Sequence, residues 1–258
     1  MTLAGSRVLV TRRREQSEEL VRAIRECGGD PVVIPLISTG PPPSWEACDG
    51  ALARISSFDA AAFASVNAVE GFTGRAHERG VSPEALGRIP SAAVGEATAA
   101  ALGRHGMRAA AVPAQYSAAS LALALGASLA GKRVLLPCGS LSLDTLPRAL
   151  TEAGAVVEPV VVYATTRSAE ADRAAIARGV RSGAFDVVTL ASPSAARYFG
   201  ELFGAPERAA VAARCRIAAI GETTAAAIRA AGFSVDVVAA ESTARGLAQS
   251  ITVRFGKA

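Results

Sequence analysis

The segment Phe58-Asp-Ala-Ala-Ala-Phe-Ala-Ser65 occurs a second time, in altered form, as Phe185-Asp-Val-Val-Thr-Leu-Ala-Ser192. In both copies an acidic residue leads into a short apolar run, and a serine follows it. This pattern is typical of a buried parallel strand that is followed by a capped helix. Other pairs recur in the same order at an offset of about 126 residues. They are Arg7-Val-Leu-Val10 with Arg133-Val-Leu-Leu136, 93–101 with 219–227 and, more loosely, 117–121 with 242–247. The sequence therefore predicts two copies of one α/β unit.

Short apolar runs alternate with helix-like segments along the whole chain. The expected strands are 7–11, 31–37, 58–64, 92–94, 134–136, 156–163, 185–191, 217–220 and 235–238. Strands that alternate with helices favour doubly wound parallel sheets. Together with the repeat, this predicts two flavodoxin-like α/β domains, and ligands favour the cleft between two such domains.

Composition excludes several classes of protein. Half of the 258 residues are hydrophobic and the formal net charge is only +4, which fits a folded protein with a small acidic ligand better than a nucleic-acid binder. The four cysteines form no CxxC pair and there are two histidines, so we expect no metal, no other cofactor and no disulfide framework. The start of the chain lacks a signal-peptide pattern, and no apolar run is long enough for a membrane span. We therefore expect a cytoplasmic protein without membrane or nucleic-acid partners.

Small polar residues and glycines follow the expected strands. In parallel sheets, ligands bind beyond the carboxyl ends of the strands, where helix N-termini present free N–H groups to anions. The candidate ligand-binding residues are Arg12, Ser65, Asn67, Gly95, Thr98, Gly139, Ser192, Ser194, Gly221, Thr223 and Thr224. Each of them taken alone is explained as a helix cap. As a group they predict a surface for a ligand with several carboxylates or phosphates.

Motifs for other chemistry are missing from the sequence. It contains neither a dinucleotide-binding GxGxxG after a strand, nor a P-loop, nor a GxSxG elbow. His77 and His105 fall in helix or loop segments, so we expect them to be exposed and outside any catalytic site. Asp59 and Asp186 open strands, which places them at the opposite edge from the candidate cleft, as turn or cap residues.

Short segments along nearly the whole chain resemble the uroporphyrinogen-III synthase family. They are Val8–Arg12, Phe63–Val69, Val134–Gly139 with Leu146–Leu150, Val162–Thr165, Ser192–Ala196 and Ala218–Ala225. The resemblance implies two α/β domains, 1–37 with 165–258 and 40–160, joined by two crossing linkers near 40–43 and 163–167. The two repeat copies would then exchange their first strand and helix between the domains.

The same resemblance implies an activity. It is that of a cofactor-free, monomeric lyase, which cyclises hydroxymethylbilane to uroporphyrinogen III with loss of water and inversion of the terminal ring. A transient contact with the upstream hydroxymethylbilane synthase is a further expectation. Tyr163 matches the linker tyrosine that has been proposed in this family to assist departure of the terminal hydroxyl, so it is the expected catalytic residue.

The sequence departs from the family at 141–144, where cationic residues are common in the family but the chain reads Leu-Ser-Leu-Asp. Arg12, Arg13 or Arg216 would have to replace a lost carboxylate contact. Two other interpretations stay open at this point: a non-catalytic bilobal binding or sensor protein for an anionic small molecule, and a degenerate synthase-like domain that acts as a regulator.

Overall fold

The computed structural model describes residues 1–112, 129–142, 144–169 and 173–256. The chain divides into two compact units, unit 1 with Met1–Ser38 and Thr166–Ala258, and unit 2 with Thr39–Thr165. The chain thus passes from one unit to the other twice. The first passage runs through β3 (Ile37–Gly40) and the second through β8 (Val156–Arg167).

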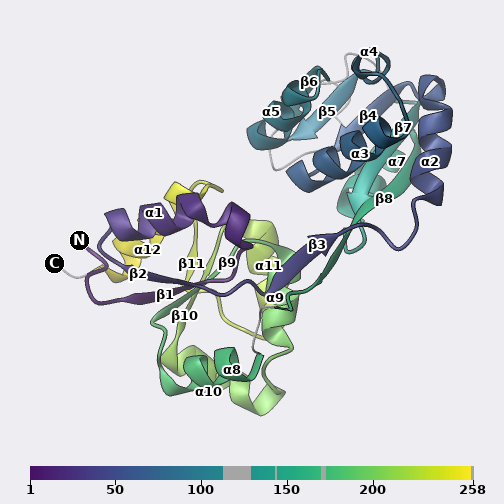
Figure 1. The fold of residues 1–258 in the computed structure, drawn as a ribbon. Helices are drawn as coiled ribbons and strands as arrows, with labels where there is room; N and C mark the ends of the chain where they lie inside the picture. The colour runs from purple at the N-terminus through teal and green to yellow at the C-terminus, as the bar shows by residue number, and fades with distance from the viewer. Residues whose placement is uncertain (113–128, 143, 170–172, 257–258) are drawn as a thin grey trace. The chain divides into compact units, whose positions relative to one another are not determined.

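Unit 1 is built on a five-stranded sheet with the order β11-β10-β9-β1-β2, and its strands are paired in parallel. The strands are β1 (Arg7–Val10), β2 (Asp30–Val33), β9 (Val187–Leu190), β10 (Arg216–Ala219) and β11 (Val237–Val238). Helices cover both faces, because alternate side chains of each strand point to opposite sides. Val8 and Val10 pack under α1 (Glu18–Glu26) and α12 (Ala244–Phe255). Leu9 packs against α8 (Arg173–Ser182), α9 (Pro193–Gly200), α10 (Ala205–Arg214) and α11 (Glu222–Ala230). Figure 1 shows α1 and α12 on one side of this sheet, and α8 and α10 on the other.

Unit 2 contains a six-stranded sheet with the order β3-β8-β7-β4-β5-β6. Its further strands are β4 (Ala60–Phe63), β5 (Ser91–Val94), β6 (Ala109–Val112) and β7 (Arg133–Gly139). Phe63 and Leu135 pack on one face under α2 (Glu46–Ala53), α3 (Val66–Glu78) and α5 (Glu96–Arg104). Val134 and Leu136 pack on the other face against α7 (Thr145–Glu152). The short segments η2 (Ile55–Ser57) and α4 (Pro83–Gly87) connect these elements, and η1 (Arg14–Gln16) connects β1 to α1 in unit 1.

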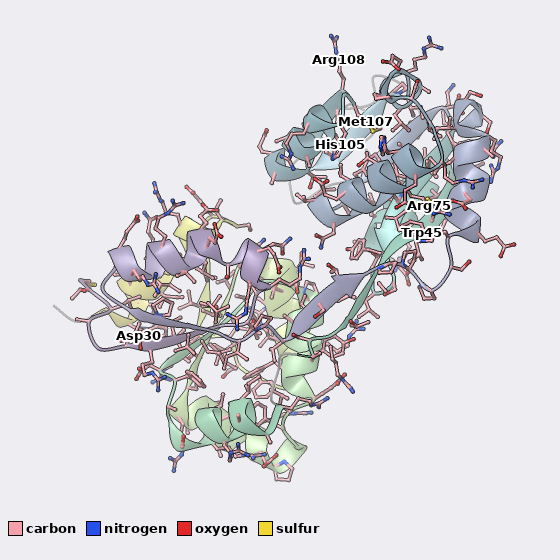
Figure 2. The ribbon with its side chains drawn as sticks, in the orientation of Figure 1. Asp30, Trp45, Arg75, His105, Met107 and Arg108 are labelled. Atoms are coloured by element: carbon pink, nitrogen blue, oxygen red, sulfur yellow. The ribbon has the colours of Figure 1, made fainter. Side chains whose placement is uncertain are left out.

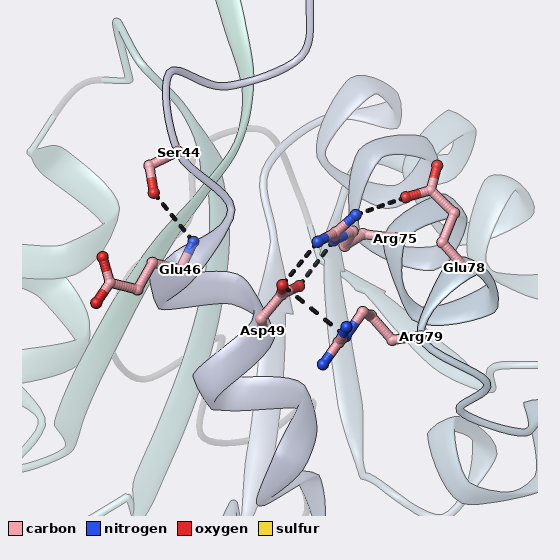
Figure 3. Close-up of polar contacts among 6 residues, drawn as sticks. All are labelled: Ser44, Glu46, Asp49, Arg75, Glu78 and Arg79. Atoms are coloured by element: carbon pink, nitrogen blue, oxygen red, sulfur yellow. Dashed lines mark hydrogen bonds and ion pairs between the residues drawn. The ribbon is translucent and has the colours of Figure 1, made fainter.

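The orientation of α3 in unit 2 is fixed by an ion-pair cluster with α2. Arg75 of α3 makes a bidentate contact to Asp49 of α2, with Nε at 2.7 Å from Oδ1 and Nη2 at 2.6 Å from Oδ2 (Figure 3). The Arg75 guanidinium also lies over the Trp45 ring, 5.0 Å from its centroid (Figure 2). These contacts lower the pKa of Asp49 and raise the pKa of Arg75, because each charge is stabilised by the other. The cluster matters for function because α3 begins at one of the predicted site residues.

The two carboxylates that open strands lie at the amino ends of the sheets, as the sequence predicted. Asp59 accepts a 2.9 Å hydrogen bond from the N–H of Arg133, the first residue of β7. Asp186 accepts a 2.7 Å bond from the N–H of Arg7, the first residue of β1. These contacts join β4 to β7 in one unit, and β9 to β1 in the other. They bind a neighbouring strand rather than cap a helix. The origin of the chain by duplication stays a prediction, and its match at 117–121 lies outside the described residues.

The predicted fold class, α/β with parallel sheets, is confirmed, whereas several strand limits are corrected. The expected strand over 31–37 is divided into β2 and β3, because Pro35 between them has no N–H to donate. Strand β6 was not predicted, and β8 continues four residues beyond the expected end at Tyr163, to Arg167. The domain limits 1–37 with 165–258 and 40–160 lie near the observed division. They remain a proposal for where the folding domains begin and end.

Candidate functional site

The Tyr163 side chain lies directly on the backbone of Gly139 in unit 2. The two residues are register partners in the parallel pair of β7 and β8, next to an irregularity between Cys138 and Gly139. A Cβ added at Gly139 would lie 2.4 Å from Cζ of Tyr163 and 2.7 Å from its phenol oxygen. Position 139 therefore has to be glycine for the ring to take this place.

The phenol of Tyr163 reaches the start of α3. Ser65 is the N-cap of this helix, and its Oγ accepts a 3.2 Å hydrogen bond from the N–H of Ala68. The same Oγ lies 3.4 Å from the phenol oxygen of Tyr163. Both residues are half-buried, so part of the pair is accessible to solvent. The site thus joins the carboxyl ends of β4 and β7 with the part of β8 that lies beside the end of β7.

A second glycine brings α3 against β8. A Cβ added at Gly71 would lie 2.5 Å from the carbonyl oxygen of Val162, the residue before Tyr163. Glycine in a helix costs about 1 kcal/mol relative to alanine, so its use here indicates a close approach that the fold requires. Gly71 therefore allows α3 to lie directly against β8 next to Tyr163.

The loop after β7 is held by its own hydroxyl and backbone groups. Ser142 Oγ accepts a 2.8 Å bond from the N–H of Gly139, and the N–H of Ser140 donates to the carbonyl oxygen of Tyr163 at 3.0 Å. Ser140 Oγ accepts from the N–H of Thr165 at 3.1 Å. This is the loop that we predict to depart from the family, and Leu143 within it lies outside the described residues. Its described part supports Tyr163 through neutral groups.

Sequence reasoning missed Gly71 and Ser142. The interior position of Gly71 in an amphipathic segment was a usable signal, since glycine weakens a helix. Short polar loops such as 140–142 carry no comparable signal, because serine there is equally common without a role.

The other predicted residues of unit 2 lie at the same end of the sheet. Gly95 begins α5 with a φ of 80°, a conformation that favours glycine, and it leaves free N–H groups at the helix start. Thr98 in the first turn of α5 is only 4 % exposed, so packing accounts for it. Asn67 in the first turn of α3 is half-buried. Their roles in ligand binding stay predictions.

Unit 1 has an analogous set of helix starts at the carboxyl ends of its strands. Ser192 caps α9 by accepting from the N–H of Ala195 at 3.1 Å, and Ser194 beside it is half-buried. Gly221 begins α11, and a Cβ there would lie 2.7 Å from Ser242 Oγ. Thr223 is exposed. Thr224, by contrast, is 3 % exposed and therefore offers a ligand little surface.

Of the three arginines predicted as carboxylate contacts, Arg12, Arg13 and Arg216, the structure separates Arg12 from Arg216. Arg12 follows β1 at the carboxyl end of the unit 1 sheet and is half-buried. Burial lowers the pKa of its guanidinium, while Glu19 acts in the opposite direction. A carboxylate bound to Arg12 would compensate for the water contacts that its guanidinium loses on burial. Arg216 instead begins β10 at the amino end, where it pairs with Asp236 at 3.4 Å, so we leave it out of the site.

Cys138 directly precedes Gly139 in β7, and burial raises the pKa of its thiol. The two histidines lie near the ends of α3 and α5. His77 is exposed near the end of α3, as expected, and His105 is half-buried at the end of α5, where its Nε2 lies 2.9 Å from Glu70. Burial raises the pKa of Cys48 to about 11 and that of Cys215 to about 12, so both are neutral thiols at pH 7. Within the described ranges, no three histidine, cysteine or acidic side chains are grouped as a metal site would require. No described helix is long and apolar enough to cross a bilayer.

Comparison with known proteins matches this chain to a family. The model of the family described as uroporphyrinogen-III synthase HemD matches residues 18–249. The chain belongs to this family. It is 30% identical over 235 residues to the uroporphyrinogen-III synthase of Chlorobaculum parvum, which covers 90% of this chain and 92% of that protein. It is also 30% identical over 256 residues to the synthase of Synechococcus elongatus, covering 96% and 95%.

Solved structures support the fold. A mutant uroporphyrinogen III synthase from Thermus thermophilus superposes with a TM-score of 0.71 at 21% identity, covering 98% of this chain and 100% of that one. The uroporphyrinogen-III synthetase of Helicobacter pylori gives 0.63 at 19% identity, with 96% and 100% covered. Family membership makes this chain a tetrapyrrole-cyclising lyase of porphyrin synthesis. A non-catalytic binding or sensor protein is accordingly not favoured.

Proposed function

We propose that this enzyme converts hydroxymethylbilane into uroporphyrinogen III, with Tyr163 as the proton donor to the departing hydroxyl. Family membership supports the reaction type. Tyr163 is assigned this role because its half-buried phenol lies on Gly139, beside the start of α3. His77 is exposed near the end of α3, and His105 is paired with Glu70, so neither histidine competes for this role.

The chemistry needs only one proton from the protein. When the terminal C–O bond breaks, the hydroxyl takes the phenol proton and leaves as water, and the pyrrole electrons stabilise the remaining azafulvene cation. The substituted α-carbon of the ring at the other end of the chain attacks this electrophilic methylene carbon, which gives a spiro intermediate. The original bond between that α-carbon and its methylene bridge then breaks, and the free α-carbon of the same ring attacks the released methylene carbon, so the macrocycle closes with that ring inverted. Loss of the ring proton at the end restores aromaticity and returns one proton to the phenolate. A neutral phenol suits this step, because it places no anion beside eight carboxylates before reaction.

The substrate carboxylates would be held by helix starts and by one arginine. In unit 2 we expect these groups to be the N–H groups at the start of α3, which Ser65 caps, with Asn67 and Gly95. In unit 1 we expect them to be Arg12, Ser192, Ser194, Gly221 and Thr223, whereas the buried Thr98 and Thr224 are left out. Backbone N–H groups at helix N-termini bind anions. The serine and threonine hydroxyls beside these N–H groups are neutral. The same substrate closes unaided to the symmetrical I isomer. We therefore also propose that it arrives through brief contact with the enzyme that makes it, before it can cyclise in solution.

Isomer analysis of the product tests this function. Freshly made hydroxymethylbilane is incubated with the protein, oxidised to the porphyrin and separated by chromatography. We expect the III isomer to dominate with protein and the I isomer without it. Equal yields of the I isomer in both reactions would show that the chain lacks the activity.

A further inference from the structure

Ser65 lies between two hydrogen-bonding partners. Its Oγ accepts from the N–H of Ala68 at 3.2 Å and lies 3.4 Å from the phenol oxygen of Tyr163. A serine hydroxyl has one proton and two lone pairs, and the cap uses one lone pair. The contact with Tyr163 therefore has two possible directions, with either hydroxyl as the donor.

The direction decides whether the phenol can act. If Tyr163 donates to Ser65, its only proton points back into the protein. If Ser65 donates to Tyr163, the phenol proton stays available to the substrate. The N–H of Ala68 and the start of the α3 dipole both draw electron density from Ser65 Oγ. This makes the serine a weaker acceptor and a stronger donor, since linked hydrogen bonds polarise one another.

We propose that Ser65 is a positioning residue for Tyr163: it donates its hydroxyl proton to the phenol oxygen and so turns the phenol proton toward the substrate. This inference rests on the proposed function, in which Tyr163 protonates the departing hydroxyl. The same Ser65 O–H then stabilises the phenolate that remains after the transfer, until the ring proton returns at the end of the reaction.

The helix cap alone does not account for this arrangement. Ser192 begins α9 with a φ of −159° and ψ of 154°, against −160° and 154° at Ser65, and it caps its helix in the same way. Capping explains a serine at both positions. The approach to a phenol is the additional feature of Ser65, and it depends on Gly139 below the ring and Gly71 behind α3.

A double-mutant cycle separates positioning from capping. Ser65→Gly removes the hydroxyl but keeps an acceptable N-cap, and Ser65→Thr keeps both functions. We expect Ser65→Gly to lower kcat about tenfold with little change in KM, since one hydrogen bond is lost. Ser65→Thr should restore kcat. In the Tyr163→Phe background, Ser65→Gly should lower kcat less than about twofold, because its partner is absent.

The matched control is Ser82→Gly. Ser82 caps α4 in the same unit by accepting from the N–H of Ala85 at 3.3 Å, and it is exposed. Its loss should leave kcat and KM unchanged. An equal loss of kcat from Ser65→Gly in the wild-type and Tyr163→Phe backgrounds would overturn the proposal, because Ser65 would then act on the substrate itself. A rise in KM with normal kcat would overturn it as well.

A spectroscopic measurement tests the hydrogen-bond direction without any turnover. The Raman doublet of tyrosine distinguishes a phenol that accepts a hydrogen bond from one that only donates, and subtraction of the Tyr163→Phe spectrum isolates Tyr163. We expect an acceptor signature in the wild type that is lost in Ser65→Gly. A donor-only signature in the wild type would overturn the inference even if isomer analysis supports the proposed function. Formation of the I isomer alone would instead show that the proposed function fails, whatever the Raman result.

Discussion

At the scale of single residues, the proposed chemistry depends on the phenol of Tyr163. Tyr163→Phe keeps the ring that packs on Gly139 and removes only the hydroxyl. We expect the melting temperature to stay close to that of the wild type while kcat falls about 10²-fold, the low end for positioned proton transfer. The loss is partial because the pyrrole electrons already expel the hydroxyl slowly without help. Steady-state kinetics with calorimetry checks this, and full activity of the variant would remove the phenol from the mechanism.

Gly139 makes the second residue-scale prediction. An alanine methyl would lie 2.4 Å from Cζ of Tyr163, so Gly139→Ala has to displace the ring. We expect a loss of about 1–3 kcal/mol in the free energy of unfolding, as for other overpacked sites, together with a large loss of kcat. In a Tyr163→Ala background the same change should cost much less stability, because the clash is gone. Denaturant unfolding of the four proteins measures this, and equal costs in both backgrounds would mean that the ring does not occupy this place.

At the scale of elements, the contact of α2 with α3 predicts a dependence of stability on pH. The Arg75 guanidinium holds the pKa of Asp49 below its ordinary value of 3.8. A carboxylate with a lowered pKa stabilises the folded state fully above its unfolded pKa, and this contribution is lost as the pH falls through the folded pKa. Asp49→Asn should therefore lower the melting temperature at pH 7, and the difference from the wild type should shrink below about pH 4.

Glu78→Gln is the control for this ion pair. Glu78 also contacts Arg75, at 2.8 Å, but its side chain is 62% exposed, so the solvent screens the pair. Its replacement should change the melting temperature less than Asp49→Asn does. A constant difference between Asp49→Asn and the wild type from pH 7 to pH 3 would show that the charge of Asp49 does not stabilise α3.

The elements also show which features a single sequence can reveal. The apolar runs around Val8 and Val188 predicted their strands, because buried parallel strands leave a continuous hydrophobic signal. The limits of β8 were not predictable in the same way, since Ala164 to Arg167 carry no apolar pattern and are extended through pairing with other strands. The strand ends identified Ser65 and Ser192 as caps, but the approach of Tyr163 to Gly139 depends on register. Register between strands far apart in sequence has no local signal.

At the scale of the whole molecule, burial and topology changed the role that we assign to several predicted residues. Thr98 and Thr224 stand at matching places after their glycines, and their spacing suggested ligand contacts. The structure places both among the buried polar residues of their units, at 4 % and 3 % exposure. Arg216 was chosen for its charge alone, and the direction of β10 puts it at the opposite end of the sheet. The sequence shows the charge and type of each residue. Which end of a strand faces the ligand can be told only from the topology of the sheet.

The whole-molecule prediction concerns metal ions. The substrate supplies its own electrophile, because pyrrole electrons expel the protonated hydroxyl and spread the resulting positive charge. The protein then needs to hold the carboxylates, orient the substrate chain and donate one proton, and none of these steps requires a Lewis acid.

We expect the initial rate and the fraction of III isomer to be unchanged after prolonged treatment with EDTA and removal of the chelator by gel filtration. Hydroxymethylbilane carries many carboxylates and can bind metal itself, so the control adds zinc or magnesium back to treated and untreated protein alike. Equal rates in all samples support catalysis by shape, anchoring and the phenol. Activity that disappears with EDTA and returns with one of the metals only in the treated protein would show that the reaction depends on an ion bound by the enzyme.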